Sequence, residues 1–277
     1  MKATKALPLH RVSLILDPDI QYCDPFEENS ESYRLFKQAF DRLLAGLDLD
    51  KENAGKEDWN PFGDFIKPGN FVVVKPNLVR HVHLEGGDIR AVIVNPIVIK
   101  LTLDYVFRAL GNTGRVVLGD AHLQSADAEK IYEINQFDRF VEFYHNNGYR
   151  LEIKDFRREA TIKDLQKLHY HFGRREVNPE EDFIEVNLKE QSLFYEVRHK
   201  FKRFRVTDYN VKLMQRAHNL IDNKYLIHKD ILNSDVIINI PKLKTHRKAG
   251  FTCAMKNHIG INGLKDYLPH CTVGTKG

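Results

Sequence analysis

The stretch Phe71-Val-Val-Val-Lys75-Pro76-Asn77 decides the fold, because it reads as a buried strand that ends in polar residues. Gly69 precedes it, and a short apolar run bounded by turn-forming residues is typical of a central strand in a parallel sheet. Short apolar runs also occur at 12–16, 115–118 and 235–240, and Leu151-Glu-Ile-Lys-Asp-Phe156 is a further strand-like segment. We therefore expect these segments to be strands as well.

Helical patterns separate several of these strands. Asn95-Pro96 predicts an N-cap followed by proline at the first helical position, and Gly111 predicts where that helix ends. Apolar residues also recur at helical spacing within 35–44 and 128–147. Because strands alternate with helices, the sequence predicts an α/β fold with a doubly wound, mainly parallel sheet.

Residues 157–230 interrupt this alternation. They are charged and aromatic, with partial period-two alternation near 183–206, and they predict an inserted β-rich or α+β segment. The chain then divides into the first part of an α/β core (1–156), an insertion or subdomain (157–230) and the resumed core (231–277). In the last part we expect the strand at 235–240 to lead into a helix from about Ala249 to Ile259.

The composition limits the function classes. A chain of 277 residues with 42% hydrophobic residues suits one large domain with a real core. The net charge of +4 is small for a nucleic-acid-binding protein. The same excess of positive charge is compatible with a protein that binds a small anionic ligand. The longest apolar runs are too short to span a bilayer, and the first residues lack a signal-peptide stretch, so we expect a cytoplasmic protein without membrane contact.

The cysteines encode no cofactor motif. Cys23, Cys253 and Cys271 are widely spaced and form no Cys-x-x-Cys pair, which argues against a disulfide framework, a zinc knuckle or an internal iron–sulfur cluster. The sequence leaves the cofactor unknown, with a metal or a tethered group still open. His81-Val-His83 could place two imidazoles on one face, but a solvated loop is the favoured interpretation, so no metal site is predicted.

Polar residues follow three of the expected strands. Lys75 and Asn77 leave the first, Asp120 and His122 leave the strand at 115–118, and a cationic stretch leaves the last. Because ligands of open α/β sheets bind beyond the carboxyl ends of the strands, these side chains are expected to share one site. Asp120 has three open roles: to bind a metal, to orient His122, or to cap the next helix.

The last of these exits carries the most positive charge. Lys242 and Lys244 are expected to position an anion near the start of the expected helix, whose N–H groups would also attract it. Thr245 and Asn257 are further candidate ligand contacts. His246 is the candidate general acid–base, because nearby cations favour its neutral, base-competent form. A backbone-bonded histidine at a helix start is the alternative.

The C-terminal motifs resemble a known family. The string from Asn239 to Gly263, with the following Lys265-Asp266-Tyr267-Leu268-Pro269-His270, resembles the family catalogued as domain of unknown function 362, as do Lys75-Pro76-Asn77 and Gly119-Asp120-Ala121. Some members carry a ferredoxin-like iron–sulfur module, so the resemblance implies a ferredoxin-like partner as one alternative. Members usually continue beyond this motif, so the resemblance also leads us to expect a truncation after Gly277.

A shorter segment is similar to the nickel-pincer lactate racemases through the spacing His246-x-x-Ala-Gly-Phe-Thr-x-x-x-Lys256. In that family the matching histidine is a proton-transfer base and the matching lysine tethers the cofactor. Cys253-Ala-Met255 stands where that family has a glycine pair, so the resemblance extends only to His246 and Lys256. By itself, the sequence would make Lys256 an ordinary solvated lysine. The resemblance implies a ligand contact or a nucleophilic amine instead.

The stretch Arg198–Arg205 mixes cations with aromatic residues, as proteins that bind single-stranded nucleic acid do. An amphipathic edge strand with one solvated face is the favoured interpretation, so nucleic-acid binding is not expected. Two functions remain. The first is an isomerase-like, racemase-like or redox-linked enzyme that acts on a small carboxylate or phosphate. The alternative is a non-catalytic binding or redox-partner module that works with an iron–sulfur protein.

Overall fold

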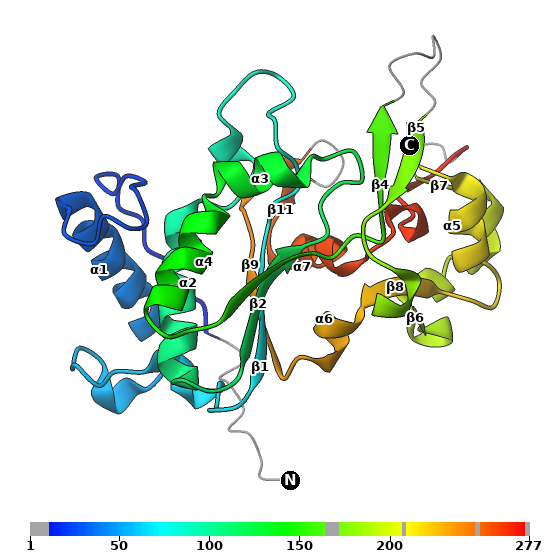
Figure 1. Cartoon of the computed structure of the whole chain (residues 1–277). Helices are drawn as coiled ribbons and strands as arrows, with labels where there is room; N and C mark the ends of the chain where they lie inside the picture. Colours follow the sequence, from blue (N-terminus) through cyan, green and yellow to red (C-terminus); the bar gives the residue numbers. More distant parts are fainter. Residues whose placement is uncertain (1–10, 164–171, 207–208, 247–249, 275–277) are drawn as a thin grey trace.

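The architecture was determined from a computed structural model that describes residues 11–163, 172–206, 209–246 and 250–274. Its centre is a four-stranded, all-parallel sheet in the order β3-β2-β1-β9 (Figure 1). The strands are β1 (Phe71–Pro76), β2 (Arg115–Asp120), β3 (Leu151–Asp155) and β9 (Val236–Ile240). The predicted α/β class and the four corresponding strand predictions are confirmed.

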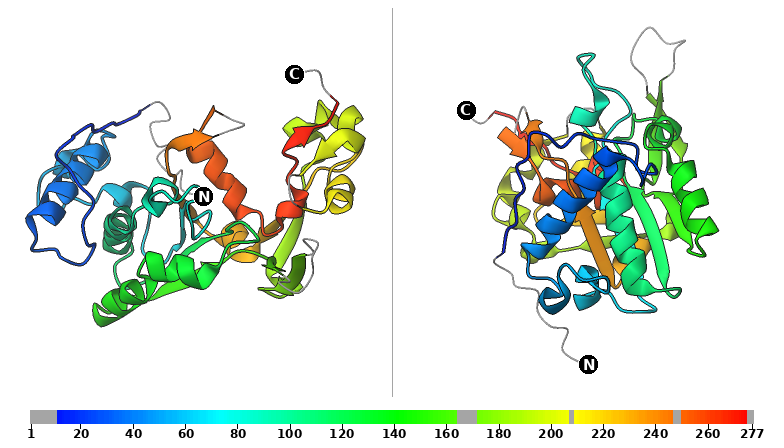
Figure 2. Two further views of the ribbon diagram at one scale, coloured as in Figure 1. Left: turned by 90° about the horizontal axis from the view of Figure 1, so that it is seen from above. Right: turned by 90° about the vertical axis from the view of Figure 1, so that its left-hand side faces the viewer.

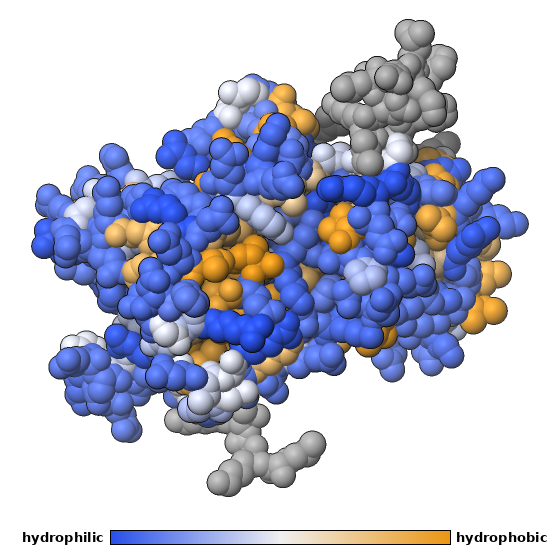
Figure 3. Space-filling view, viewed as in Figure 1, coloured by the Kyte–Doolittle hydropathy of each residue, from blue (hydrophilic) through white to orange (hydrophobic). Residues whose placement is uncertain are grey.

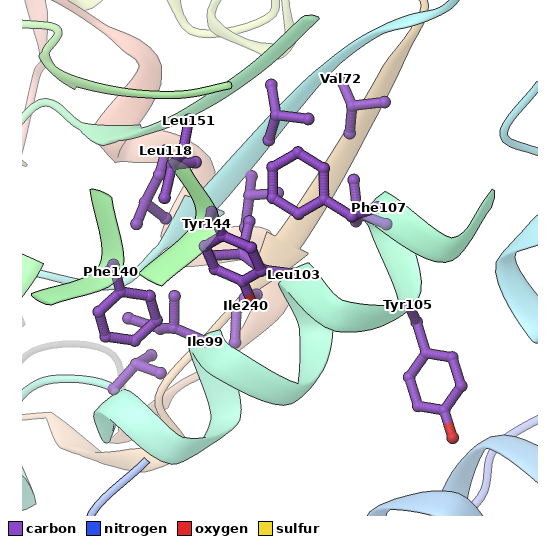
Figure 4. Close-up of a cluster of buried hydrophobic side chains, with 14 of the residues drawn as sticks. Val72, Ile99, Leu103, Tyr105, Phe107, Leu118, Phe140, Tyr144, Leu151 and Ile240 are labelled. Carbon is purple, nitrogen blue, oxygen red and sulfur yellow. The ribbon is translucent and has the colours of Figure 1, made fainter. Parts of the chain in front are cut away.

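The strands form a central sheet because alternate side chains enter two different cores. On one face, Val72 and Leu118 pack against α2 (Pro96–Leu110) and α4 (Phe137–Asn146), as Figure 4 shows for α2 and its neighbours. On the other face, Val73 packs with Ile231 of α6 (Lys229–Asn233). Since both faces are covered, the strands carry continuous apolar runs, as the sequence indicated.

Helix α2 shows how local sequence sets an element. The Oδ1 atom of Asn95 accepts a hydrogen bond from the backbone N–H of Ile97 at 3.1 Å, and Pro96 occupies the first turn. At the other end Gly111 has a φ of 61°, which terminates the helix with a bond from its N–H to the carbonyl of Phe107. Both predicted ends are confirmed.

Two local predictions are wrong. Residues 12–16 form no strand; Val12, Leu14 and Leu16 are more than four-fifths exposed, because no neighbouring strand pairs with them within the described residues. The expected single helix at 128–147 is two helices, α3 (Ala128–Ile134) and α4, because Gln136 adopts a φ of 58° between them. The expected helix near 35–44 is confirmed as α1 (Glu31–Ala45), capped by the side chain of Ser30.

The segment after β3 is built from short antiparallel pairs. These pairs are β4 (Glu159–Lys163) with β5 (Phe172–Glu176), β6 (Phe183–Asn187) with β8 (Lys224–His228), and β7 (Phe204–Arg205) with β12 (Cys271–Thr272). The inserted β-rich segment is thus confirmed, whereas the boundaries 1–156, 157–230 and 231–277 stay a prediction. In Figure 2, α1 and α5 (Val211–Ala217) lie at opposite ends of the molecule.

The expected edge strand at 198–205 is wrong over most of its length. Residues Arg198–Arg203 form a 3-10 helix, and only Phe204–Arg205 is extended. Phe204 is buried in a small cluster with Val206 and Met214, whereas Lys202 and Arg203 are exposed. Phe204 therefore packs in the core of this cluster, and Lys202 and Arg203 lie on a solvent-exposed face.

The expected helix from Ala249 to Ile259 is also wrong. Strands β10 (Lys244–His246) and β11 (Gly250–Thr252) form an antiparallel hairpin, and α7 (Ala254–Asn257) is a single turn followed by a 3-10 turn. Gly250 has a φ of 72°, and Phe251 is 69% exposed, so the apolar stripe that suggested a longer helix is not buried as one face. Within 250–274, the described part of the chain that follows the hairpin's first strand, no long helix begins that could attract an anion.

Among the described residues, no helix combines the length and the apolar character that a membrane span requires. The face drawn in Figure 3 is largely hydrophilic, with apolar areas between its charged groups.

We predict that Leu103→Ala lowers the free energy of unfolding by about 2–5 kcal/mol, because Leu103 is fully buried in the cluster between α2 and the sheet. Urea unfolding followed by circular dichroism measures the change. The matched control is Leu35→Ala, which deletes the same atoms from a side chain on α1 that is 43% exposed. Equal losses in the two variants would contradict the assignment of the core.

Candidate functional site

The strand order identifies where a ligand should bind. From β1 the chain moves to β2 and then to β3 on one side, and it returns as β9 on the other side of β1. The order therefore reverses between β1 and β9, and in doubly wound sheets the crevice outside the carboxyl ends at such a point is the usual ligand site. Lys75 and Asn77 come from the end of β1, and Asn239 comes from the end of β9.

Asn257 ties these two strand ends together. Its Nδ2 atom donates to the carbonyl of Lys75 at 3.2 Å and to Oδ1 of Asn239 at 2.7 Å. Its Oδ1 atom accepts from Lys75 Nζ at 2.9 Å and from Asn77 Nδ2 at 3.1 Å. Only 3% of the surface of Asn257 is exposed, so it links the two strand ends from a buried position. Its predicted contact with a ligand stays a prediction.

Lys75 and Asp120 form a buried ion pair beside Asn257. Lys75 Nζ lies 2.7 Å from Asp120 Oδ1, and the two residues are 1% and 2% exposed. Burial lowers the pKa of Lys75, and the carboxylate of Asp120 opposes that shift. The second oxygen of Asp120 accepts from the backbone N–H of Leu78 at 2.9 Å, so both carboxylate oxygens bind protein groups.

A glycine makes room for this pair. A Cβ atom at Gly260 would lie 2.6 Å from Lys75 Nζ and closer still to Asp120 Oδ1, so any other residue there would have to displace the buried pair. Asp120 does not cap the next helix: it is the last residue of β2, and Asp127 accepts the capping bond of α3 from Lys130 N–H. That interpretation of Asp120 is wrong.

His122 follows Asp120 and is fully buried. Its Nδ1 atom lies 2.9 Å from the carbonyl oxygen of Leu78, which can only accept, so Nδ1 carries the proton. Asp120 Oδ2 is 3.9 Å away and does not orient the ring through a short bond. Burial lowers the pKa of His122, which keeps the imidazole neutral.

Lys244 enters the site from β10. Its Nζ atom donates to Asn77 Oδ1 at 2.7 Å and to the carbonyl of Val92 at 2.6 Å. Burial lowers the pKa of Lys244 to about 8; Asp120 opposes this shift, and neighbouring cations, Lys242 first, add to it. The Lys244 side chain therefore loses its proton, and with it its charge, at a pH of about 8.

His246 and Lys256 meet at the end of the hairpin. Lys256 Nζ lies 2.6 Å from His246 Nε2. An ammonium can only donate, so with Lys256 charged His246 accepts at Nε2. The hairpin creates this contact because His246 and Lys244 lie on the same face of β10, whereas Thr245 points to the opposite, exposed face.

The remaining predicted residue, Lys242, lies on the rim. Its Nζ atom is 3.2 Å from the hydroxyl of Tyr22 and 5.3 Å from the centre of that ring. The structure thus brings Lys75, Asn77, Lys244 and Asn257 into one hydrogen-bonded cluster. His246 and Lys256 meet as a separate pair, and His122 sits behind Asp120.

Sequence reasoning missed Lys265. Its Nζ atom is buried and donates to the carbonyls of Ile259 at 3.0 Å and Asn262 at 2.8 Å, and burial lowers its pKa to about 7. Its place in the motif that follows Gly263 was the available signal. Lys265 holds the 259–262 turn, including Gly260, against the Lys75–Asp120 pair.

His81 and His83 serve their own loops. His81 Nδ1 accepts from the backbone N–H of Asp127 at 3.0 Å, and His83 Nδ1 accepts from that of Gly87 at 3.1 Å. Throughout the described part of the chain, no group of three or more His, Cys, Asp or Glu side chains is arranged to hold a metal ion.

The fold and this edge define the class: a doubly wound α/β protein with a lysine-rich site at its strand-order reversal. Residues 178–275 match the family described as Domain of unknown function (DUF362), which confirms the resemblance of the C-terminal motif. Lys75-Pro76-Asn77 and Gly119-Asp120-Ala121 lie outside the matched residues. Neither the curated proteins nor the solved structures provide a match. The similarity to nickel-pincer lactate racemases stays a prediction.

We predict that Asp120→Asn lowers the free energy of unfolding by about 3–5 kcal/mol, because it leaves Lys75 buried without its counter-charge. Chemical unfolding at pH 7 measures the loss. Asp17→Asn removes one partner of the exposed pair with Arg42 and should cost less than about 1 kcal/mol. The double variant Lys75→Met/Asp120→Leu should be more stable than Asp120→Asn; a less stable double variant would contradict the charge argument.

Proposed function

We propose that the protein is an enzyme that acts on a small anionic substrate, a carboxylate or a phosphate, at the carboxyl edge of β1 and β9. His246 is its acid–base group, and Lys244 and Lys242 hold the substrate's charge. The observation that carries the proposal is the 2.6 Å contact between His246 Nε2 and Lys256 Nζ, on the same hairpin face as Lys244.

The charge balance of the site favours an anion. Lys242, Arg80 and Lys256 all act on Lys244 with the same sign, and Asp120 is the acidic group that opposes them. Asp120 is already engaged by Lys75 at 2.7 Å. A ligand with one or two negative charges would therefore relieve the repulsion among these cations.

The same cations suit His246 to proton transfer. With Lys256 donating to Nε2, the imidazole is neutral and able to act as a base. Once a substrate anion draws the ammonium of Lys256 towards itself, Nε2 can take a proton from the substrate. The resulting imidazolium lies beside a cation, so it returns the proton readily. Removal of one proton and its return to the opposite face of the same carbon, or to a different atom, is an isomerisation, in which no oxidant or reductant is consumed.

The alternative function is a non-catalytic module for an iron–sulfur partner. It rests on the ferredoxin-like iron–sulfur modules that some members of the resembled family carry. Among the described residues, no contact favours it over the enzyme. A redox-linked reaction at the same edge would use the same anion-binding lysines.

We predict that the protein catalyses exchange of a substrate carbon-bound proton with solvent, and that His246→Gln slows it about 100-fold or more, since general acid–base groups contribute about 10²–10⁴ in rate. Incubation of the full chain in D2O with a panel of 2-hydroxy- and 2-amino-carboxylates, followed by proton NMR, measures the exchange. His199→Gln in the 198–203 turn is the matched control. No exchange by the unaltered protein, or equal exchange by both variants, would overturn the proposal.

We predict that anion affinity falls as the pH rises through about 8. The pKa of Lys244 is lowered to about 8, so this ammonium is charged below that pH and neutral above it. A bound anion raises that pKa, which places the fall slightly above 8. Calorimetric titration with oxalate, which does not itself titrate in this range, measures affinity from pH 6.5 to 9.5.

Lys244→Met should weaken oxalate binding at pH 7 about tenfold, equivalent to about 1.4 kcal/mol, and remove the pH dependence near 8. Lys202→Met, which removes an exposed lysine from the 198–203 turn, is the control and should bind as the unaltered protein does. A flat pH profile in the unaltered protein would contradict the role of Lys244.

A further inference from the structure

Two clefts adjoin the proposed site along the segment 20–25. One has a volume of about 470 Å³ and extends to Asn135, and the other has about 450 Å³ and extends to Lys242. Tyr22 and Arg90 line both clefts, so the two clefts are adjacent, and we call them together the groove. Its volume is in the range of pockets for small organic ligands, which is more than oxalate or a two-carbon acid would fill.

One wall of the groove also contacts the residues of the proposed site. Residues 89–91 and 93–96 line the groove, and the same segment bonds to the site: the carbonyl of Val92 accepts from Lys244 Nζ at 2.6 Å, and the N–H of Val94 donates to the carbonyl of Asn77 at 3.0 Å. Lys242, two residues before Lys244, lines the near end. A ligand held at Lys242 would therefore extend along the groove.

The lining changes in character with distance from the lysines. At the near end, Lys242 Nζ lies over the ring of Tyr22, and Arg90 is paired with Asp88 by a side-chain bond of 2.8 Å. Further along, Ile93 and Pro96 provide apolar wall. An anionic group is favoured at the first part and an uncharged chain at the second.

The far end presents a hydrogen-bond acceptor. Asn135 is fully buried; its Nδ2 atom donates to the carbonyl of Ile131 at 2.7 Å, and its Oδ1 atom has no partner among the described residues. An unsatisfied buried acceptor is costly, and a ligand O–H or N–H would satisfy it. The adjacent start of α2 does not compete for an anion, because Pro96 has no N–H and Asn95 caps the next one.

From these features, and resting on the proposed function, we infer that this groove binds the part of the substrate remote from the reacting carbon. That part is a short apolar chain that ends in a hydroxyl or amine, whose hydrogen atom is donated to Asn135 Oδ1. The substrate class is thus a carboxylate or phosphate with an apolar chain and a distal donor.

The test compares hexanoate with 6-hydroxyhexanoate, titrated calorimetrically into the full chain, with oxalate titrated in parallel. We expect the hydroxyl to increase affinity at least tenfold. Asn135→Leu should abolish this preference, and its urea midpoint shows whether the variant is folded. Ile134→Ala shortens a half-buried side chain that lines only the cleft without Lys242, and it should weaken both six-carbon acids without changing oxalate binding.

Each outcome separates the two proposals. Equal affinities for the two six-carbon acids, or a preference that survives Asn135→Leu, would overturn the groove's role while leaving oxalate binding as evidence for the anion site. Loss of oxalate binding with the hydroxyl preference retained would overturn the anion site instead. Failure of all three acids to bind would overturn both.

Discussion

The ion pair of Lys75 and Asp120 joins the ends of β1 and β2 in a place where neither charge is exposed to water. Burying one of these charges alone would cost several kcal/mol, so each residue requires the other. Asn257 then links this pair to β9, and Gly260 leaves the space that the pair occupies. The bond from Lys244 to Asn77 and the turn that Lys265 holds both adjoin this group of buried residues.

The same pairing explains why the edge is cationic. Because Asp120 is engaged by Lys75, it cannot neutralise Lys244 as well, and the cations on the hairpin and the rim add to the imbalance. The buried carboxylate thus stabilises Lys75, whereas the ammonium of Lys244 donates to the neutral oxygen atoms of Asn77 and Val92. A site of this kind gains more from an anion than an exposed lysine cluster would, because burial reduces screening by water.

The sequence was informative where structure is local. Helix α2 has its cap, its proline and its terminating glycine within one contiguous stretch, and the strands are short apolar runs; both were predictable. The hairpin at 244–252 was not, since its conformation depends on a positive φ at Gly250 and on pairing across the turn. The contact of His246 with Lys256 was suggested only by a resemblance. The role of Asn257 depends on the strand order, to which residues far apart in sequence contribute.

The pairing of β1 with β9 has a consequence for how the chain is made. The N–H of Phe71 bonds to the side chain of Asp235, and 164 residues separate the two. During synthesis β1, β2 and β3 emerge with their helices long before β9 exists, so they can associate while one edge of β1 is still unpaired. Contacts this distant in sequence are slow to form because the intervening chain must first be closed into a loop. The junction between the ends of β1 and β9 is therefore expected to be among the last parts of the protein to form.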